Sequence, residues 1–304
     1  MTMKRYERLL LRAASLGLGV AIAASPRLLG QTNLRVVPGE VVDDRFSEGM
    51  LTGHLHVELG IEGEGRDGIK AARFLVKESK DDTGSSLVGK DRKEARFEKV
   101  DQQMRVRVDL GTPPRKAKTF QLSGKLELFV PAKDPKSVVK VPGALRTKDK
   151  PLKSSGLKSA KVGVTVLSKS AYDEQKKKQK LDDAKIAEIR AEGKKHGMSD
   201  KETDALIELG KALQEMGDTS LTDAAVILTG KLADMEKIVD VGLQKSDGTS
   251  IDIGESSSSS DGKTKTMVLK PRETPPADAV LVFTLLTEKA KISIPVDLTD
   301  VPLP

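Results

Sequence analysis

The first half of the chain alternates apolar and polar residues, which is the pattern of half-buried β-strands. From 104 to 110 every second residue is apolar and the residues between are polar or charged, and the same period of two runs from 120 to 130. Side chains on a strand point alternately to opposite faces, so each segment places one face on a core and the other in water. Polar turns separate the segments. We therefore expect an antiparallel, immunoglobulin-like β-sandwich over residues 48–142.

The second half repeats this alternation around one helical region. Alternating segments occupy 162–166, 239–243 and 292–298. Short stretches of the two halves also match, such as Val139 to Pro142 and Ile292 to Pro295. A weak internal duplication explains the matches, although antiparallel domains in general share such patterns. We expect a second sandwich over residues 159–304, which makes the chain mainly β.

The helical region predicts a hairpin inserted at 171–217. Ser199 with Glu202 three residues later forms a capping box, which predicts that a helix begins there. Leu206, Leu209 and Leu213 follow at helical spacing and form a narrow apolar seam. A lysine-rich helix over about 172–192 precedes them, and residues 193–197 are expected to form the turn.

Residues 143–158 are expected to be a basic linker between the sandwiches. The stretch from 140 to 161 holds seven lysine or arginine residues and one acidic residue, together with prolines and glycines. This composition is typical of a semi-extended connector.

Residues 1–24 have the order of a secretory signal peptide. Four basic residues precede an uncharged apolar run, which ends in the small-residue site Ala21-Ile22-Ala23. An uncleaved membrane anchor is the alternative, but the run is shorter than the roughly 20 apolar residues that a spanning helix needs. We expect an exported protein, periplasmic or extracellular, with an N-terminal arm over 25–47 and no transmembrane segment after cleavage.

Composition narrows the classes of function. Removing the four basic residues and Glu7 of the leader lowers the formal charge from +7 to +4, which is mild for this length and argues against a nucleic-acid binder. The absence of cysteine excludes disulfides and thiol chemistry. No nucleophile elbow is present either. A non-catalytic role without a cofactor is therefore the expectation.

His54, His56 and Glu58 are the candidate metal ligands. On a strand, every second residue shares a face, so these three side chains project together. Two neighbouring imidazoles are a common ligand pair, and a metal-dependent enzyme is the corresponding alternative function. The plainer alternative is the solvent-facing side of an amphipathic strand, because no third ligand of a zinc site is evident.

Two surfaces are candidates for partner binding. The seam of Leu206, Leu209 and Leu213, or a sheet edge, would contact a protein of the cell envelope. The basic linker and the lysines at 176–180 would instead meet an anionic envelope polymer. The plainer explanation for both basic stretches is solubility.

The second half resembles a large set of uncharacterised secreted bacterial proteins with immunoglobulin-like sandwiches. The resemblance rests on the strand Gly163 to Val166, on Leu243 before Asp247-Gly248, and on the ending Ile294 to Pro304. It covers about 161–304 without the hairpin. It implies a fold and an exported location, and it supplies no active-site residues.

Overall fold

A computed structural model describes residues 33–44, 53–89, 95–179, 183–216 and 221–304. Within these ranges the side chains at 178–179, 183–184 and 213–216 are not described. The expected signal peptide, 1–24, lies outside the described residues. Part of the expected N-terminal arm is a strand, because residues 35–44 pair with the strand that begins at His54.

The chain is mainly β, as the alternation predicted, and its strands form several antiparallel sheets. The strands of the first part are β1 (Arg35–Asp44), β2 (His54–Glu62), β3 (Ala71–Asp81), β4 (Glu98–Lys99), β5 (Arg105–Gly111), β6 (Thr119–Phe129) and β7 (Val138–Pro142). Those of the second part are β8 (Thr165–Leu167), β9 (Val226–Lys231), β10 (Ile238–Gln244), β11 (Ser250–Ile251), β12 (Ile253–Ser260), β13 (Thr264–Pro271), β14 (Val280–Leu285) and β15 (Lys291–Pro302).

The α-helices found among the described residues lie in the second part of the chain. They are α1 (Ser155–Ser159), α2 (Lys169–Gln179), α3 (Asp183–Lys195), α4 (Asp200–Met216) and α5 (Leu232–Met235). Short 3-10 turns connect several of the strands.

The chain divides into two compact units. Unit 1 combines residues 1–128 with 292–304, and unit 2 is the continuous segment 129–291. Two chain segments therefore join the units, one at 128–129 and one at 291–292.

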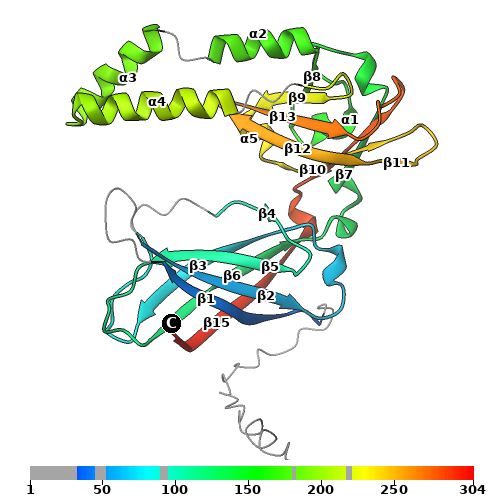
Figure 1. Ribbon diagram of the computed structural model, residues 1–304. Helices are drawn as coiled ribbons and strands as arrows, with labels where there is room; N and C mark the ends of the chain where they lie inside the picture. The colour runs from blue at the N-terminus through cyan, green and yellow to red at the C-terminus, as the bar shows by residue number, and fades with distance from the viewer. Residues whose placement is uncertain (1–32, 45–52, 90–94, 180–182, 217–220) are drawn as a thin grey trace, which may run out of the picture. The chain divides into compact units, whose positions relative to one another are not determined.

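Unit 1 contains a three-stranded sheet of order β1-β2-β5 and a four-stranded sheet of order β15-β6-β3-β4. Figure 1 draws β15, in red, among the blue to green strands of this unit. The predicted alternation is visible in burial: Leu55, Val57 and Leu59 of β2 are fully buried, and the polar residues between them are not. Val106, Val108 and Leu110 of β5 are buried in the same alternating way.

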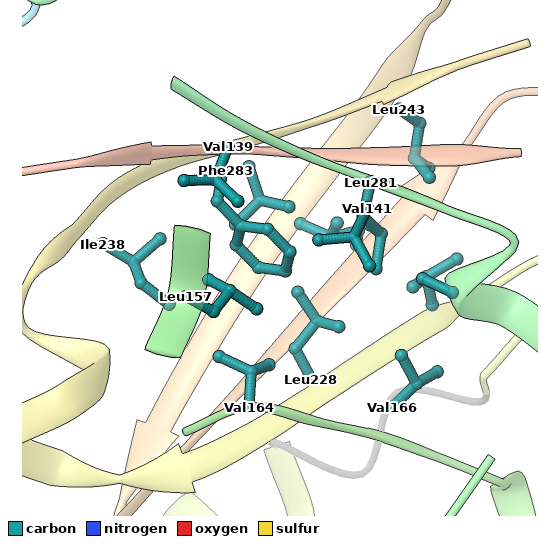
Figure 2. Close-up of a cluster of buried hydrophobic side chains, with 14 of the residues drawn as sticks. Val139, Val141, Leu157, Val164, Val166, Leu228, Ile238, Leu243, Leu281 and Phe283 are labelled. Atoms are coloured by element: carbon teal, nitrogen blue, oxygen red, sulfur yellow. The ribbon is translucent and has the colours of Figure 1, made fainter. Parts of the chain in front are cut away.

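Unit 2 contains two four-stranded sheets, of order β11-β10-β14-β7 and β12-β13-β9-β8. Its core gathers side chains from both sheets and from α1. Figure 2 shows Phe283 and Leu281 of β14 beside Val139 and Val141 of β7, with Leu157 of α1 nearby. Burial of this apolar surface is the main source of stability in a unit that has no disulfide.

The strand pairing divides the chain differently from the expected boundaries of 48–142 and 159–304. β7, expected to close the first sandwich, pairs along its whole length with β14 in unit 2. β15, expected in the second sandwich, is a neighbour of β6 in unit 1. Alternation shows that a segment is a strand with a buried face, but it does not identify the strand's partner.

The expected basic linker, 143–158, is part of unit 2. Ala144 is 2% exposed and Leu157 is 1% exposed, and both belong to the core of the unit. Ser154 caps α1 by accepting a hydrogen bond from the Leu157 amide. The lysines mark the outer side of this segment, while its few apolar residues hold it on the core.

The run Ser256–Ser260 has the low complexity that is typical of a loop, but it is a strand. These residues form the end of β12 and pair in continuous register with β13, from Ser256 opposite Leu269 to Ser260 opposite Lys265. Serine has a weak intrinsic preference for strands, so the partner strand decides the conformation here.

Candidate functional site

The metal-ligand candidates lie on the polar face of the three-stranded sheet in unit 1. β2 is the central strand of this sheet, with β1 on one side and β5 on the other. His54, His56 and Glu58 occupy alternate positions on it, each at least partly exposed, while the residues between them are buried. The rings of His54 and His56 have centroids 6.1 Å apart. The strand therefore brings the three side chains to one face, as expected from the sequence.

His56 lies between two carboxylates from the neighbouring strands. Its Nδ1 is 2.7 Å from Oδ1 of Asp109 on β5, and its Nε2 is 3.2 Å from Oδ2 of Asp44 on β1. Nη2 of Arg107 also lies 2.7 Å from each of the two ring nitrogens. Both nitrogens therefore already have hydrogen-bonding neighbours, and a metal ligand needs a free lone pair on one of them, so this arrangement competes with metal binding.

The surrounding charges form ion pairs, one within β5 and one between β5 and β2. Nε of Arg107 donates to Oδ1 of Asp109 at 2.9 Å, and Nη1 of Arg105 donates to Oε2 of Glu58 at 2.8 Å. Burial raises the pKa of Asp109. Hydrogen bonds from Arg107 and His56 together lower it by more, so the net pKa lies below its usual value. Glu58, the third candidate ligand, is thus held by an arginine.

No cluster of three or more histidine or acidic residues that could hold a metal ion occurs within the described ranges. On this face, His56 and Glu58 of β2 pair with charged side chains of the neighbouring strands, and cross-strand pairs of this kind support sheet pairing. The sequence placed the three residues on one face correctly. It gave no indication of Asp44, Arg105, Arg107 and Asp109, which depend on strand register.

The second candidate site is built on α3 and α4, which contact each other. The predicted capping box is present at the start of α4. Ser199 accepts from the Glu202 amide at 3.3 Å, and Glu202 accepts from the Ser199 amide at 2.8 Å. The hydrogen bond from the Ser199 amide is also the main reason that the pKa of Glu202 lies below its usual value.

The turn between α3 and α4 is shorter than expected. α3 continues to Lys195, so Gly193 lies inside the helix instead of opening the turn. A Cβ atom at Gly193 would stand 2.6 Å from Oγ1 of Thr203 on α4. Gly193 therefore allows the two helices to approach closely. Arg190 of α3 adds an ion pair across them, with Nη2 2.8 Å from Oδ1 of Asp204.

The apolar residues of α4 divide between two faces. Thr203 and Ile207, one turn apart, are buried, with exposures of 2% and 5%. Leu206 and Leu209 are 44% and 55% exposed, and they are two of the four large hydrophobic residues that the structure exposes among the residues it describes. Leu213 belongs to α4, but its side chain lies outside the described residues. Among the described residues, the seam at Leu206 and Leu209 therefore has no apolar cover.

The basic segment from 140 to 161 presents its cations to solvent. The seven cations of this segment are all exposed, and none forms a salt bridge with another residue in the described part of the chain. They are Lys140, Arg146, Lys148, Lys150, Lys153, Lys158 and Lys161.

A charge cluster that the sequence pattern does not indicate lies between β3 and β6 of unit 1. Glu127, 7% exposed, accepts from Nε of Arg73 at 2.8 Å, and Lys125 lies 2.9 Å from its other oxygen. The Arg73 guanidinium also stands 4.7 Å from the centre of the Phe97 ring. Glu127 is a single glutamate at a strand position, and the sequence pattern does not indicate that this position is buried. We interpret the pairing of Glu127 with Arg73 and Lys125 as structural.

No protein-family model, curated protein or solved structure is significantly similar to this chain. Among the helices described, none has both the length and the apolar character needed to cross a bilayer.

Proposed function

We propose that this chain is an exported, non-catalytic binding protein that contacts a protein partner through the exposed face of α4. The observation that carries the proposal is the exposure of Leu206 and Leu209 beside the buried Ile207. Exposed leucines three residues apart lie on one side of a helix, and such anchors are how an amphipathic helix enters an apolar groove. The buried side of α4 is already used by α3, which leaves the leucine side for another molecule.

The partner that suits this face has an apolar groove with a basic rim. α4 carries five acidic and two basic residues, and Asp204 is paired with Arg190. Glu202, four residues before Leu206, is exposed on the same side of the helix as the leucines. Complementary charge at the rim speeds association and selects the partner, while the apolar centre supplies most of the affinity.

The proposal includes the fold of the two units as immunoglobulin-like sandwiches and of α3–α4 as an inserted helical hairpin. In such a sandwich, strands A, B, E and D form one sheet and C, F and G the other. Unit 2 is consistent with this arrangement. Its first sheet, β8-β9-β13-β12, corresponds to strands A, B, E and D in that order. In its second sheet, β10, β14 and β7 correspond to C, F and G. The hairpin then projects between the first and second strands, where an insertion leaves the core intact.

Export places the partner in the cell envelope. The signal-peptide pattern of residues 1–24 supports this location, and the lack of cysteine means that the protein needs no oxidising folding step.

Substituting both leucines tests the proposal. Proteins captured on the mature chain from the envelope fraction would be identified and purified, and their affinity for the wild type and for Leu206→Gln/Leu209→Gln compared. Burying two half-exposed leucines contributes about 2 kcal/mol, so the double variant should bind roughly 30-fold more weakly. The variant should keep its stability within about 0.5 kcal/mol, because both positions are on the surface.

Glu208→Gln is the matched control, since it introduces the same side chain at an exposed position between the two leucines in sequence but on another face. It should change the affinity much less than the leucine variant. Equal affinity of the wild type and the leucine variant for every captured protein would contradict the proposal.

An anionic envelope polymer is the second candidate ligand, favoured by the seven exposed cations between 140 and 161 that lack salt bridges within the described residues. Cations that form no salt bridge interact with an anionic surface at little cost in competing ion pairs. Sedimentation with anionic polymer at increasing salt tests this role, because binding through these groups should weaken as salt screens them. Salt-independent binding, or none at low salt, would rule it out.

A further inference from the structure

The four-stranded sheets β15-β6-β3-β4 of unit 1 and β11-β10-β14-β7 of unit 2 have the same strand order. In each, a long strand pairs with the short strand that follows it: β4 pairs with the start of β3, and β11 pairs with the end of β10. The other neighbour of that long strand is the last long strand before the chain crosses over, β6 or β14. An edge strand then completes the sheet, β15 in unit 1 and β7 in unit 2.

The turns after β3 and β10 share their local chemistry. The Asp81 carboxylate accepts from the Thr83 amide at 2.8 Å, and the Asp247 carboxylate accepts from the Thr249 amide at 2.8 Å. Each turn also contains a glycine with positive φ, Gly84 at +86° three residues after Asp81 and Gly248 at +91° directly after Asp247. An aspartate-centred turn after the corresponding strand of each sheet supports descent of both units from one duplicated sandwich.

The two edge strands are equivalent in sequence but sit in opposite units. β7 holds Val139-Lys140-Val141-Pro142, and β15 holds the same apolar-polar-apolar-proline order at Ile292 to Pro295. β7 directly follows β6, yet it pairs with β14. β15 directly follows β14, yet it is a neighbour of β6, and the Leu303 amide donates to the Lys118 carbonyl at 2.8 Å.

We propose that the chain is a duplicated sandwich whose two closing strands, β7 and β15, are exchanged between its units. Without exchange, β7 would return on β6 and β15 on β14, each by a tight hairpin. In the exchanged arrangement, β7 follows β6 of unit 1 but completes the sheet of unit 2. β15 follows β14 of unit 2 but completes the sheet of unit 1. The exchange of β7 and β15 does not depend on which surface of the protein binds a partner.

The connection between β6 and β7 favours exchange. The segment after β6 contains Pro131 and Pro135, which restrict φ, and Val130 and Asp134 before them are extended. Short hinge loops that resist a tight turn invite strand exchange.

The two connections also bind each other inside unit 2. The Val130 amide donates to the Ala290 carbonyl at 2.8 Å, and the hydroxyls of Ser137 and Thr287 are 2.7 Å apart. Ser137 and Ala290 are fully buried. The crossings are thus a packed part of the fold, and opening them would expose these buried groups.

A cysteine pair tests the exchange in the full chain, which has no cysteine of its own. Lys140 and Val282 are opposite each other in the β7–β14 pair, and Lys140 lies on the exposed face. Opposite residues in a sheet are within the distance that a disulfide spans. Under mild oxidation, Lys140→Cys/Val282→Cys should form one disulfide within a single chain in most molecules, located by peptide mapping. The single-cysteine variants are the controls.

Absence of this disulfide in a folded variant would overturn the proposal. So would a disulfide found only between two chains, because it would mean that strands are exchanged between molecules. Val138→Cys/Thr284→Cys, another opposite pair, repeats the test if the first variant fails to fold.

Hydrogen exchange supplies a second measurement without cysteine. Val141→Ala on β7 should speed exchange in β14 of unit 2, and Val296→Ala on β15 should speed it in β6 of unit 1. The reverse assignment would show that the strands return on their own units and would overturn the proposal.

Discussion

At the scale of single residues, neighbouring cations stabilise the ionised form of a buried carboxyl group in unit 1. Burial raises the pKa of Glu127, but hydrogen bonds from Lys125 and Arg73 lower it more, so the net pKa lies below the ordinary value of 4.5. A carboxyl group whose pKa is lowered in the folded state adds stability above its unfolded pKa, and that stability is lost as the pH falls toward the folded pKa. The ion pair should therefore contribute at neutral pH and fade in acid.

Glu127→Gln tests this. At pH 7 the variant should be about 2 kcal/mol less stable, because Arg73, a half-buried cation, loses its carboxylate. The difference from the wild type should shrink as the pH drops below about 4.5. Urea denaturation across pH 3–7 measures both effects. A difference that is the same at every pH would mean that lost packing, and not charge, explains the effect.

Gly124 shows how much of a residue's role can be predicted from the sequence. A glycine in the middle of an alternating strand predicts a bulge or a close approach of backbone. A Cβ at this position would stand 2.4 Å from the Leu75 carbonyl oxygen and 2.7 Å from the Phe74 ring. The sequence indicated that the position was special, but only the neighbouring strand β3 shows why.

At the scale of elements, α4 owes its start to local chemistry and its position to α3. The capping box satisfies amide groups that the first turn of a helix leaves without partners. The close approach at Gly193 and the Arg190–Asp204 pair then hold α4 against α3.

Ser199→Ala should weaken α4 by about 1 kcal/mol, because it removes the cap. Ser199→Asp should retain most of the stability, since aspartate caps equally well. Thermal melting followed by the helical circular dichroism signal separates the two variants. Equal melting of Ser199→Ala and the wild type would show that packing on α3 alone fixes the start of the helix.

At the scale of the whole molecule, the continuous segment 129–291 holds a complete pair of sheets. β7 contributes Val139 and Val141, 7% and 5% exposed, to the core of this unit. A unit cut after β7 would lose both side chains and one edge of a sheet.

We expect fragment 129–291 to fold alone and to melt cooperatively. Fragment 143–291, which lacks β7, should be less stable by about 3–6 kcal/mol, because two buried valines are lost. Denaturant unfolding of the two fragments checks this. Equal stability would mean that β7 is not part of the core of unit 2.

The sequence by itself determined what depends on near neighbours: which segments alternate as strands, where α4 is capped, and which side chains share the face of β2. Periodicity and capping act over a few residues, so they can be read along the chain. Tertiary structure alone decided that residues 143–158 belong to a core, that Ser256–Ser260 form a strand, and that β7 and β15 lie in opposite units. Strand partners are chosen by burial and register between segments far apart in sequence, and β7 and β15 are so alike that no local pattern could assign either one to its sheet.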